Sequence, residues 1–180
     1  MKSFVPICKN LFISTGICLL SIPATYGIPP TRLLTAKTTY NQTNAWGSTY
    51  YFTIKLPESL DNWQLQQVVF TQIDGLENIE FDEKNSVAFA ETNGQKEKLG
   101  ITLAKNPHQP QTFIATFNQP VAANQTITIG LKPFHNPTNE GIYQFRVQVV
   151  SSGEKANNLV VGTARLQFSD YFDNRIFKRW

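Results

Sequence analysis

The sequence of 180 residues contains little of several residue types on which catalysis, metal binding and covalent cross-linking depend. It has two cysteines, two histidines and one methionine, so a soft-metal site or a Cys-His catalytic pair has few side chains to draw on. Charged residues make up 16%, and the formal net charge of +3 is too small and too scattered to indicate a nucleic-acid-binding surface. The hydrophobic share of 41% is ordinary for one globular domain.

The chain also lacks a hydrophobic run of the roughly 20 residues that a membrane-spanning helix requires. The apolar segment 11–22 is shorter, follows a basic start and precedes a group of small residues that ends at Gly27. This order is typical of a secretory signal peptide. We therefore predict a cleaved signal peptide over 1–27. Cleavage after Ala24 is the alternative site, and a buried helix of the domain is the competing interpretation.

Cleavage after residue 27 would remove both cysteines, Cys8 and Cys18, and two of the 16 positive charges. The net charge of 28–180 would then be 14 − 13 = +1. An exported chain without disulfides is stabilised by its core alone, and a chain of about 150 residues buries roughly 70% of its unfolded surface. We expect an exported protein, periplasmic or extracellular, with no transmembrane span in the mature chain.

The region 28–168 is predicted to form a single all-β domain. In 49–56, Tyr50 and Phe52 alternate with Tyr51 and Thr53, the period of two that a half-buried strand shows. The same pattern predicts further strands at 65–72, 100–104, 111–117, 126–131, 143–150 and 159–168, with weaker ones at 32–36 and 86–90. Turn signals such as Asn93-Gly94 separate them. About 7–9 short strands at this spacing predict an antiparallel, immunoglobulin-like β-sandwich.

Several short motifs occur in a fixed order along this region. They are Pro30-Thr31-Arg32-Leu33, 47–52 with Leu56-Pro57, 65–75, 117–121, 126–133, Asn136-Pro137, 141–147, Gly153-Glu154 and 162–168. The set resembles a family of uncharacterised exported proteins, found mainly in cyanobacteria and recorded as a domain of unknown function. The resemblance covers roughly 29–168 and departs in the turns at 122–124 and 150–152. It implies a secreted or periplasmic β domain and supplies no active-site residues.

Most of these motifs have an architectural explanation. Asn136-Pro137 and Glu140-Gly141 bracket a loop between two strands, where a fixed φ and a permissive glycine set the reversal. Tyr143 is placed to act as a corner tyrosine, whose hydroxyl ties a loop to the backbone. Gln72 is placed to satisfy buried backbone groups at a strand end. We expect these positions to shape the domain, with a binding edge as the alternative.

Candidate chemistry is sparse. His108 and His135 both lie in predicted loops, and no motif places a nucleophile beside either of them. Glu80, Asp82 and Glu83 would begin a calcium site, but the spacing of a calcium loop is absent, and a solvated acidic face is the better interpretation. A pair of carboxylates spaced across a cleft, as in a glycosidase, stays open as an alternative, and no motif in the sequence selects one. We therefore expect no catalytic, metal-binding or cofactor-binding residues.

Two tryptophans are the candidate ligand-contacting residues. Trp46 lies in a polar loop before a strand, and Trp63 follows Asp61-Asn62 in another loop. An indole among polar residues suits stacking on sugar rings or a protein contact, because it has an apolar face and one donor. The alternative is that each indole covers one end of the core.

The last segment, 169–180, is expected to form a short aromatic and basic tail. Together these observations predict a secreted or periplasmic, non-catalytic protein that binds a cell-envelope polysaccharide or protein. The alternative function is an exported hydrolase or metal-dependent enzyme that uses Asp, Glu and His.

Overall fold

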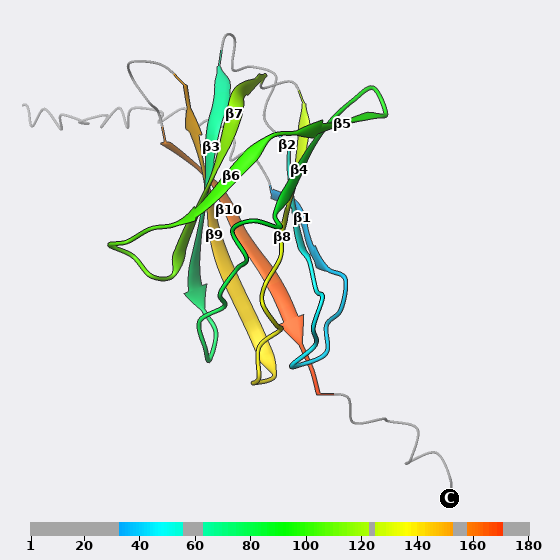
Figure 1. Cartoon of the computed structure of the whole chain (residues 1–180), viewed down its shortest axis with the longest axis vertical. Helices are drawn as coiled ribbons and strands as arrows, with labels where there is room; N and C mark the ends of the chain where they lie inside the picture. Colours follow the sequence, from blue (N-terminus) through cyan, green and yellow to red (C-terminus); the bar gives the residue numbers. More distant parts are fainter. Residues whose placement is uncertain (1–32, 56–62, 123–124, 153–157, 171–180) are drawn as a thin grey trace, which may run out of the picture.

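The computed structural model describes residues 33–55, 63–122, 125–152 and 158–170. The predicted signal peptide over 1–27 and most of the predicted tail lie outside these ranges. Within them, no helix is long and apolar enough to cross a membrane. The described chain is built of β-strands and connecting loops (Figure 1).

Ten strands form two antiparallel five-stranded sheets, which pack face to face. Sheet I has the order β1-β2-β8-β4-β5, and sheet II has the order β10-β9-β3-β7-β6. The strands of sheet I are β1 (Leu33–Thr38), β2 (Tyr50–Lys55), β4 (Val87–Thr92), β5 (Gln95–Leu99) and β8 (Thr126–Leu131). Those of sheet II are β3 (Gln64–Asp74), β6 (Ile101–Lys105), β7 (Thr112–Ala122), β9 (Gly141–Ser151) and β10 (Asn158–Phe168).

The predicted all-β sandwich is confirmed. The structure has ten strands, one more than the upper limit of the predicted range of 7–9. The missed strand is β5, whose sequence QKEKL is polar and shows no hydrophobic alternation. It forms because Asn93 and Gly94 both adopt positive φ, 52° and 79°, and turn the chain back along β4 as a hairpin. As an edge strand, β5 has few side chains to bury, and its lysines protect the edge from pairing with another chain.

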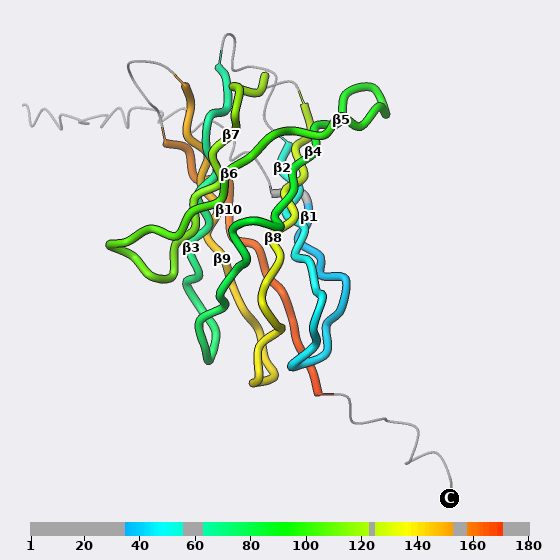
Figure 2. The backbone as a smooth tube through the Cα atoms, in the orientation of Figure 1, coloured from blue at the N-terminus to red at the C-terminus, as the bar shows by residue number. Residues whose placement is uncertain are grey.

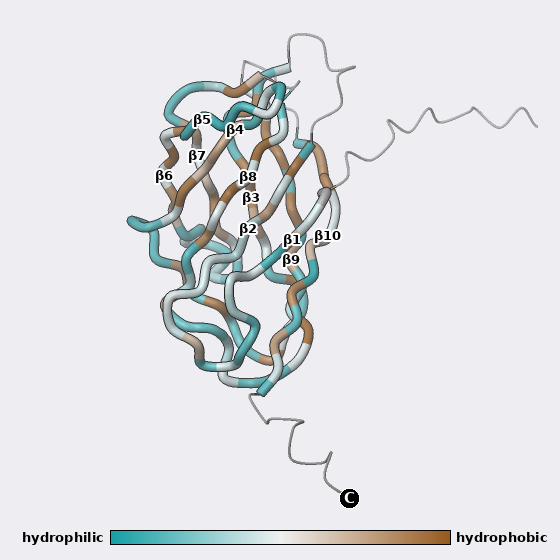
Figure 3. Tube along the Cα trace, turned by 90° about the vertical axis from the view of Figure 1, so that its right-hand side faces the viewer, coloured by the Kyte–Doolittle hydropathy of each residue, from teal (hydrophilic) through white to brown (hydrophobic). Residues whose placement is uncertain are grey.

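The two sheets approach each other at both sides of the sandwich. On one side, the single residue Gly100 separates β5 of sheet I from β6 of sheet II, so one nearly continuous stretch passes between the sheets (Figure 1). The Gly100 carbonyl accepts a hydrogen bond from the Asn118 backbone at 2.9 Å. On the other side, β1 lies beside β10 (Figure 3).

The core lies between the sheets and is rich in aromatic rings. Phe52 of β2 is fully buried, with its ring centroid 4.8 Å from that of Phe70 and 5.7 Å from that of Phe145. Phe81, from the β3–β4 loop, packs edge-on against Phe113 and Tyr50. Such tilted and edge-to-face pairs are the favoured geometries of aromatic rings. Hydropathy accordingly alternates along the strands, and many connecting segments are hydrophilic (Figure 3).

Candidate functional site

Three loops meet at one end of the sandwich, which we name the loop end (Figure 2). They are the β1–β2 loop (39–49), the β3–β4 loop (75–86) and the β8–β9 loop (132–140). The end of β10 joins them, because Ser169 and Asn41 share a backbone hydrogen bond of 3.0 Å and the Thr43 hydroxyl bonds to Asp170. Segments far apart in the sequence therefore form one surface.

Asn136 links the β8–β9 loop to the β1–β2 loop from a position with no solvent exposure (0%). Its side-chain amide donates to the carbonyls of Tyr40 (2.9 Å) and Gln42 (2.7 Å). Its side-chain oxygen accepts from the Tyr50 hydroxyl at 3.0 Å, and its backbone N–H donates to Ala45 at 2.9 Å. A buried amide that is fully paired in this way holds the loops in one arrangement.

Tyr143 links the β8–β9 loop to the β3–β4 loop. Its hydroxyl donates to the Asn139 carbonyl at 3.0 Å, which confirms the predicted corner tyrosine. Glu77 lies beside it and accepts hydrogen bonds from the Asn139 backbone (2.8 Å) and from the Tyr143 hydroxyl. The predicted role of Gln72 is also confirmed, because its side-chain oxygen accepts from the Ile79 backbone at 2.9 Å and its amide donates to the Glu77 carbonyl at 2.7 Å.

The ionisable groups of this network have shifted pKa values. Burial raises the pKa of Tyr143 to about 12, and the neighbouring charge of Glu77 adds to the increase. Burial also raises the pKa of Tyr50 far above its ordinary value. For Glu77, burial alone would raise the pKa of the carboxyl. Hydrogen bonds from the backbone of Asn139 and Thr138 outweigh this effect and hold the pKa below its usual value. Both tyrosines are therefore neutral and Glu77 is ionised at neutral pH.

Several large hydrophobic side chains point out of the loop end, whereas the polar Asn136 is buried within it. Trp46 is 78% exposed, and its ring centroid lies 6.0 Å from that of His135. Exposed hydrophobic side chains also come from each of the three loops. We name this set the loop-end apolar surface, and its members are Tyr40, Trp46, Leu76 and Phe134.

The structure does not bring the two predicted ligand-contacting residues together. Trp46 precedes β2 at the loop end, whereas Trp63 precedes β3, which starts at the opposite end of the sandwich (Figure 1). Trp63 is only partly exposed and packs against the hydrophobic core. The two indoles lie at opposite ends of the sandwich, so they are separate candidates.

The histidines and the acidic loop have local roles. His135 Nδ1 lies 2.7 Å from the Asn136 carbonyl, and His108 sits in the β6–β7 turn. Glu80 pairs with the Lys105 ammonium at 2.6 Å, Glu83 accepts from the Lys105 backbone, and Asp82 closes a turn by accepting from the Lys84 backbone. No group of three His, Cys, Asp or Glu side chains within the described ranges is arranged to hold a metal ion.

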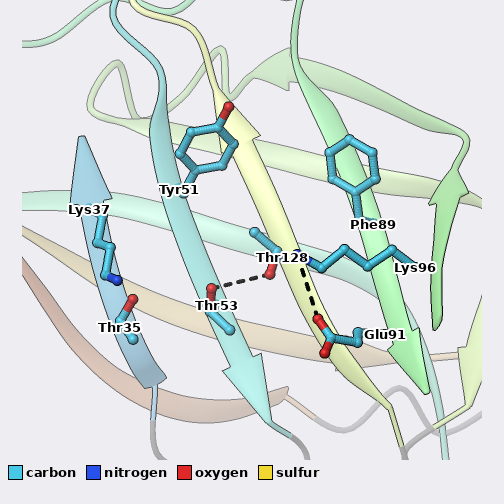
Figure 4. A pocket seen from close by; sticks show the side chains of 8 residues that line it. All are labelled: Thr35, Lys37, Tyr51, Thr53, Phe89, Glu91, Lys96 and Thr128. Carbon is cyan, nitrogen blue, oxygen red and sulfur yellow. Dashed lines mark hydrogen bonds and ion pairs between the residues drawn. The ribbon is translucent and has the colours of Figure 1, made fainter. Parts of the chain in front are cut away.

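A second candidate site is a groove on the outer face of sheet I, with a volume of about 470 Å³ (Figure 4). Its floor includes the hydroxyls of Thr53 and Thr128, which lie 3.1 Å apart on neighbouring strands. The aromatic rings of Tyr51 and Phe89 stand on either side of β8. The remaining lining residues, from β1, β4 and β5, are Thr35, Lys37, Glu91 and Lys96.

The strand register explains why these side chains meet. Tyr51 pairs with Gly130 of β8, and Gly130 pairs with Val87 of β4. A Cβ atom at Gly130 would lie only 3.0 Å from both Tyr51 Cε1 and Val87 Cγ2. Glycine at this position therefore leaves room for the Tyr51 ring to lie against the sheet.

Sequence reasoning missed this groove. Alternation in 49–56 does place Tyr51 and Thr53 on the polar face of their strand, and that is the signal which was available. The partners of β2 in the sheet are β1 and β8, and β8 in turn pairs with β4. Pairings between strands so distant in sequence cannot be deduced from alternation, which shows the face of a strand but not its neighbours.

Two packed antiparallel five-stranded sheets define the protein as a β-sandwich domain. Its sequence matches the model of a protein family of unknown function, DUF2808, over residues 24–168. The chain belongs to that family.

Comparison with solved structures gives matches of low sequence identity. The collagen-binding subdomain of the Enterococcus faecalis surface protein ACE is 6% identical, with a TM-score of 0.42, covering 67% of this chain and 86% of that one. A cohesin module of a Clostridium perfringens family 33 glycoside hydrolase is 8% identical (TM-score 0.39; 78% and 99% covered). The collagen-binding domain of a Staphylococcus aureus adhesin is 7% identical (TM-score 0.39; 68% and 87% covered). No curated protein matches the sequence. These likenesses say nothing of what this chain binds.

Proposed function

We propose that this protein is an exported, non-catalytic component of a cyanobacterial cell envelope that binds another envelope component, a polysaccharide or a protein. The loop-end apolar surface is its contact site. The observation that carries this proposal is the 78% exposure of Trp46 beside His135, on loops that buried hydrogen bonds hold in place. Export is supported by the signal-peptide pattern over 1–27.

The loop end has the features of a binding surface. Four of the seven exposed large hydrophobic side chains in the described residues come from these three loops, and exposed hydrophobic side chains gathered in one region mark interaction sites more often than scattered ones do. Tryptophan and tyrosine are enriched among the residues that dominate binding energy, because they bury much area at little entropic cost. The hydrogen bonds of Asn136 and Tyr143 order the three loops before any partner arrives, which lowers the entropic cost of association.

The proposal is tested by sedimentation of the purified protein with isolated cell envelopes, before and after digestion of their polysaccharide. We expect the wild-type protein to sediment and the Trp46→Ala variant to stay in the supernatant. The matched control is Val160→Ala, which removes an exposed hydrophobic side chain from β10, far from the three loops. It should sediment like the wild type.

Sensitivity to digestion would identify a polysaccharide partner, and sedimentation that survives digestion would identify a protein or lipid partner. The proposal fails if the wild-type protein does not sediment, or if Trp46→Ala sediments as well as wild type does.

A further inference from the structure

The outer face of sheet I has an excess of positive charge. Four lysines project outward, because each lies opposite an outward-facing residue of the neighbouring strand: Lys37 opposite Tyr51, Lys55 opposite Thr126, Lys96 opposite Glu91 and Lys98 opposite Phe89. Glu91 is the one acidic side chain on the outward positions of these described strands. The excess is 4 − 1 = +3, equal to the net charge of the whole chain.

These lysines are available to a ligand. Lys96 lies 3.7 Å from Glu91, but the two side chains are 70% and 43% exposed, and such surface pairs contribute little. The other ion pair found in the described part of the chain joins Lys105 to Glu80 in the loops, so no acidic side chain there pairs with Lys37. The ammonium groups at both sides of the groove therefore face solvent.

The groove between these lysines combines three kinds of side chain. Tyr51 and Phe89 offer apolar ring faces, and Thr53 and Thr128 offer hydroxyls on the floor (Figure 4). Ring faces pack against the C–H face of a pyranose, and threonine hydroxyls exchange hydrogen bonds with sugar hydroxyls. Ammonium groups attract carboxylate or sulfate. A neutral glycan would leave the lysines unused, and a simple polyanion would leave the rings unused.

The dimensions favour an extended ligand. Lys37 and Lys96 belong to the two edge strands of sheet I, which are four strand spacings apart. At about 4.8 Å per spacing, the backbones of the two lysines are separated by roughly 19 Å across the sheet. The Lys96 side chain reaches over β4 toward Thr128, so its ammonium group lies above the groove (Figure 4). A chain of sugar units that crosses the groove can therefore reach both lysines.

We propose that the groove on sheet I binds an anionic polysaccharide, with pyranose rings against Tyr51 and Phe89 and its acidic groups near Lys37 and Lys96. This goes beyond the function proposed above, because the groove lies on a sheet face and is separate from the loop-end apolar surface. The two sites can therefore be inactivated one at a time.

The test measures the affinity of the purified full chain for polygalacturonate, with neutral dextran and poly-glutamate as comparison ligands. We expect saturable binding to polygalacturonate that exceeds binding to either comparison ligand at least about tenfold. The Lys37→Gln/Lys96→Gln variant should bind about tenfold more weakly. Its matched control is Lys84→Gln/Arg165→Gln, which removes the same charge from exposed positions elsewhere and should stay within about twofold of wild type.

A second variant tests the aromatic contacts. Tyr51→Thr/Phe89→Thr keeps residues that favour strands and leaves the charge unchanged. It should also lose about tenfold in affinity, and Trp46→Ala should lose none. Denaturant midpoints of all variants serve to confirm folding.

Three results would overturn the proposal. Equal losses in the lysine variant and its charge control would show general electrostatic attraction. Unchanged affinity in the Tyr51→Thr/Phe89→Thr variant would show that the two rings do not contact the sugar. Equally tight binding of poly-glutamate would show that the site recognises acidic chains in general. Loss of envelope sedimentation in Trp46→Ala with intact polygalacturonate binding would separate the two sites.

Discussion

The middle of the sandwich and its loop end differ in the side chains that they bury and expose. Between the sheets, rings such as Phe52 and Phe70 are buried while Thr53 and Lys55 point outward. At the loop end, Asn136 is buried and Trp46 is exposed. The strands pair their own backbone groups, so their interior can be wholly apolar, whereas loops need side chains to pair theirs. The amide that orders the loops thus shares the interior with Ile79 and Phe81, while Trp46 remains outside.

The largest expected effect is on the middle of the sandwich. Phe52→Ala would leave a cavity against Phe70 and Phe145 and should lower the free energy of unfolding by about 3–5 kcal/mol. Urea denaturation checks this. A loss below about 1 kcal/mol would show that the core relaxes around the missing ring.

At the loop end, Asn136→Ala would remove the side-chain partner of the Gln42 carbonyl and of the Tyr50 hydroxyl, and one of the donors to the Tyr40 carbonyl. The expected loss is about 3 kcal/mol, since each buried unpaired group costs about 1–3 kcal/mol. The exposed Asn41→Ala, in the same loop, is the control and should be neutral. Similar denaturation midpoints for the two variants would contradict a structural role for the buried amide.

Alkaline pH should destabilise the domain through the two buried tyrosines of the loop-end network. The pKa of Tyr143 is raised to about 12 and that of Tyr50 is raised further, so folding favours the neutral phenols. Their contribution is complete below the unfolded pKa of about 10 and is lost as pH rises through the folded values. Ultraviolet titration of tyrosinate, with denaturation at each pH, measures this. Tyr143→Phe should reduce the loss of folding stability at alkaline pH. Tyr40→Phe, with an exposed ring, should not.

Acidic pH should also lower the stability of the domain through this network, by a smaller amount. The pKa of Glu77 is lowered by its hydrogen bonds, so its contribution is present above the unfolded pKa of about 4.3 and is lost as pH falls through the folded value. Glu77→Gln should therefore reduce the slope of stability against pH in this acidic range. An unchanged slope would mean that other carboxylates dominate acid unfolding.

The smallest effect on stability is expected for Trp46→Ala. The side chain is mostly exposed, so the free energy of unfolding should stay within about 0.5 kcal/mol of wild type. A larger loss would show that the indole belongs to the folded network of the loop end. Trp46 would then be a structural residue of the loop end and no longer free for a partner.

Much of the middle of the sandwich was predictable from sequence, and much of the rest was not. Alternation located nine of the ten strands, since burial on one face imposes a period of two. It failed at β5, where an exposed edge imposes no such pattern. Tyr143 and Gln72 were assigned their roles because both act within a few residues of their own position. Asn136 was recognised as a turn residue, but its bonds to Tyr40 and Gln42 span a long stretch of sequence.

The amino-acid order alone specifies an all-β domain and, in the strands that alternate, the face that is buried, because these properties depend on neighbours one or two residues away. It also marks Trp46 and Trp63 as unusual, but only the folded chain separates them, with Trp63 against the core and Trp46 exposed at the loop end. The groove exists only after β1, β2, β8, β4 and β5 pair in that order. Strand order and loop contacts depend on distant pairings, which the fold selects by burying the whole core at once.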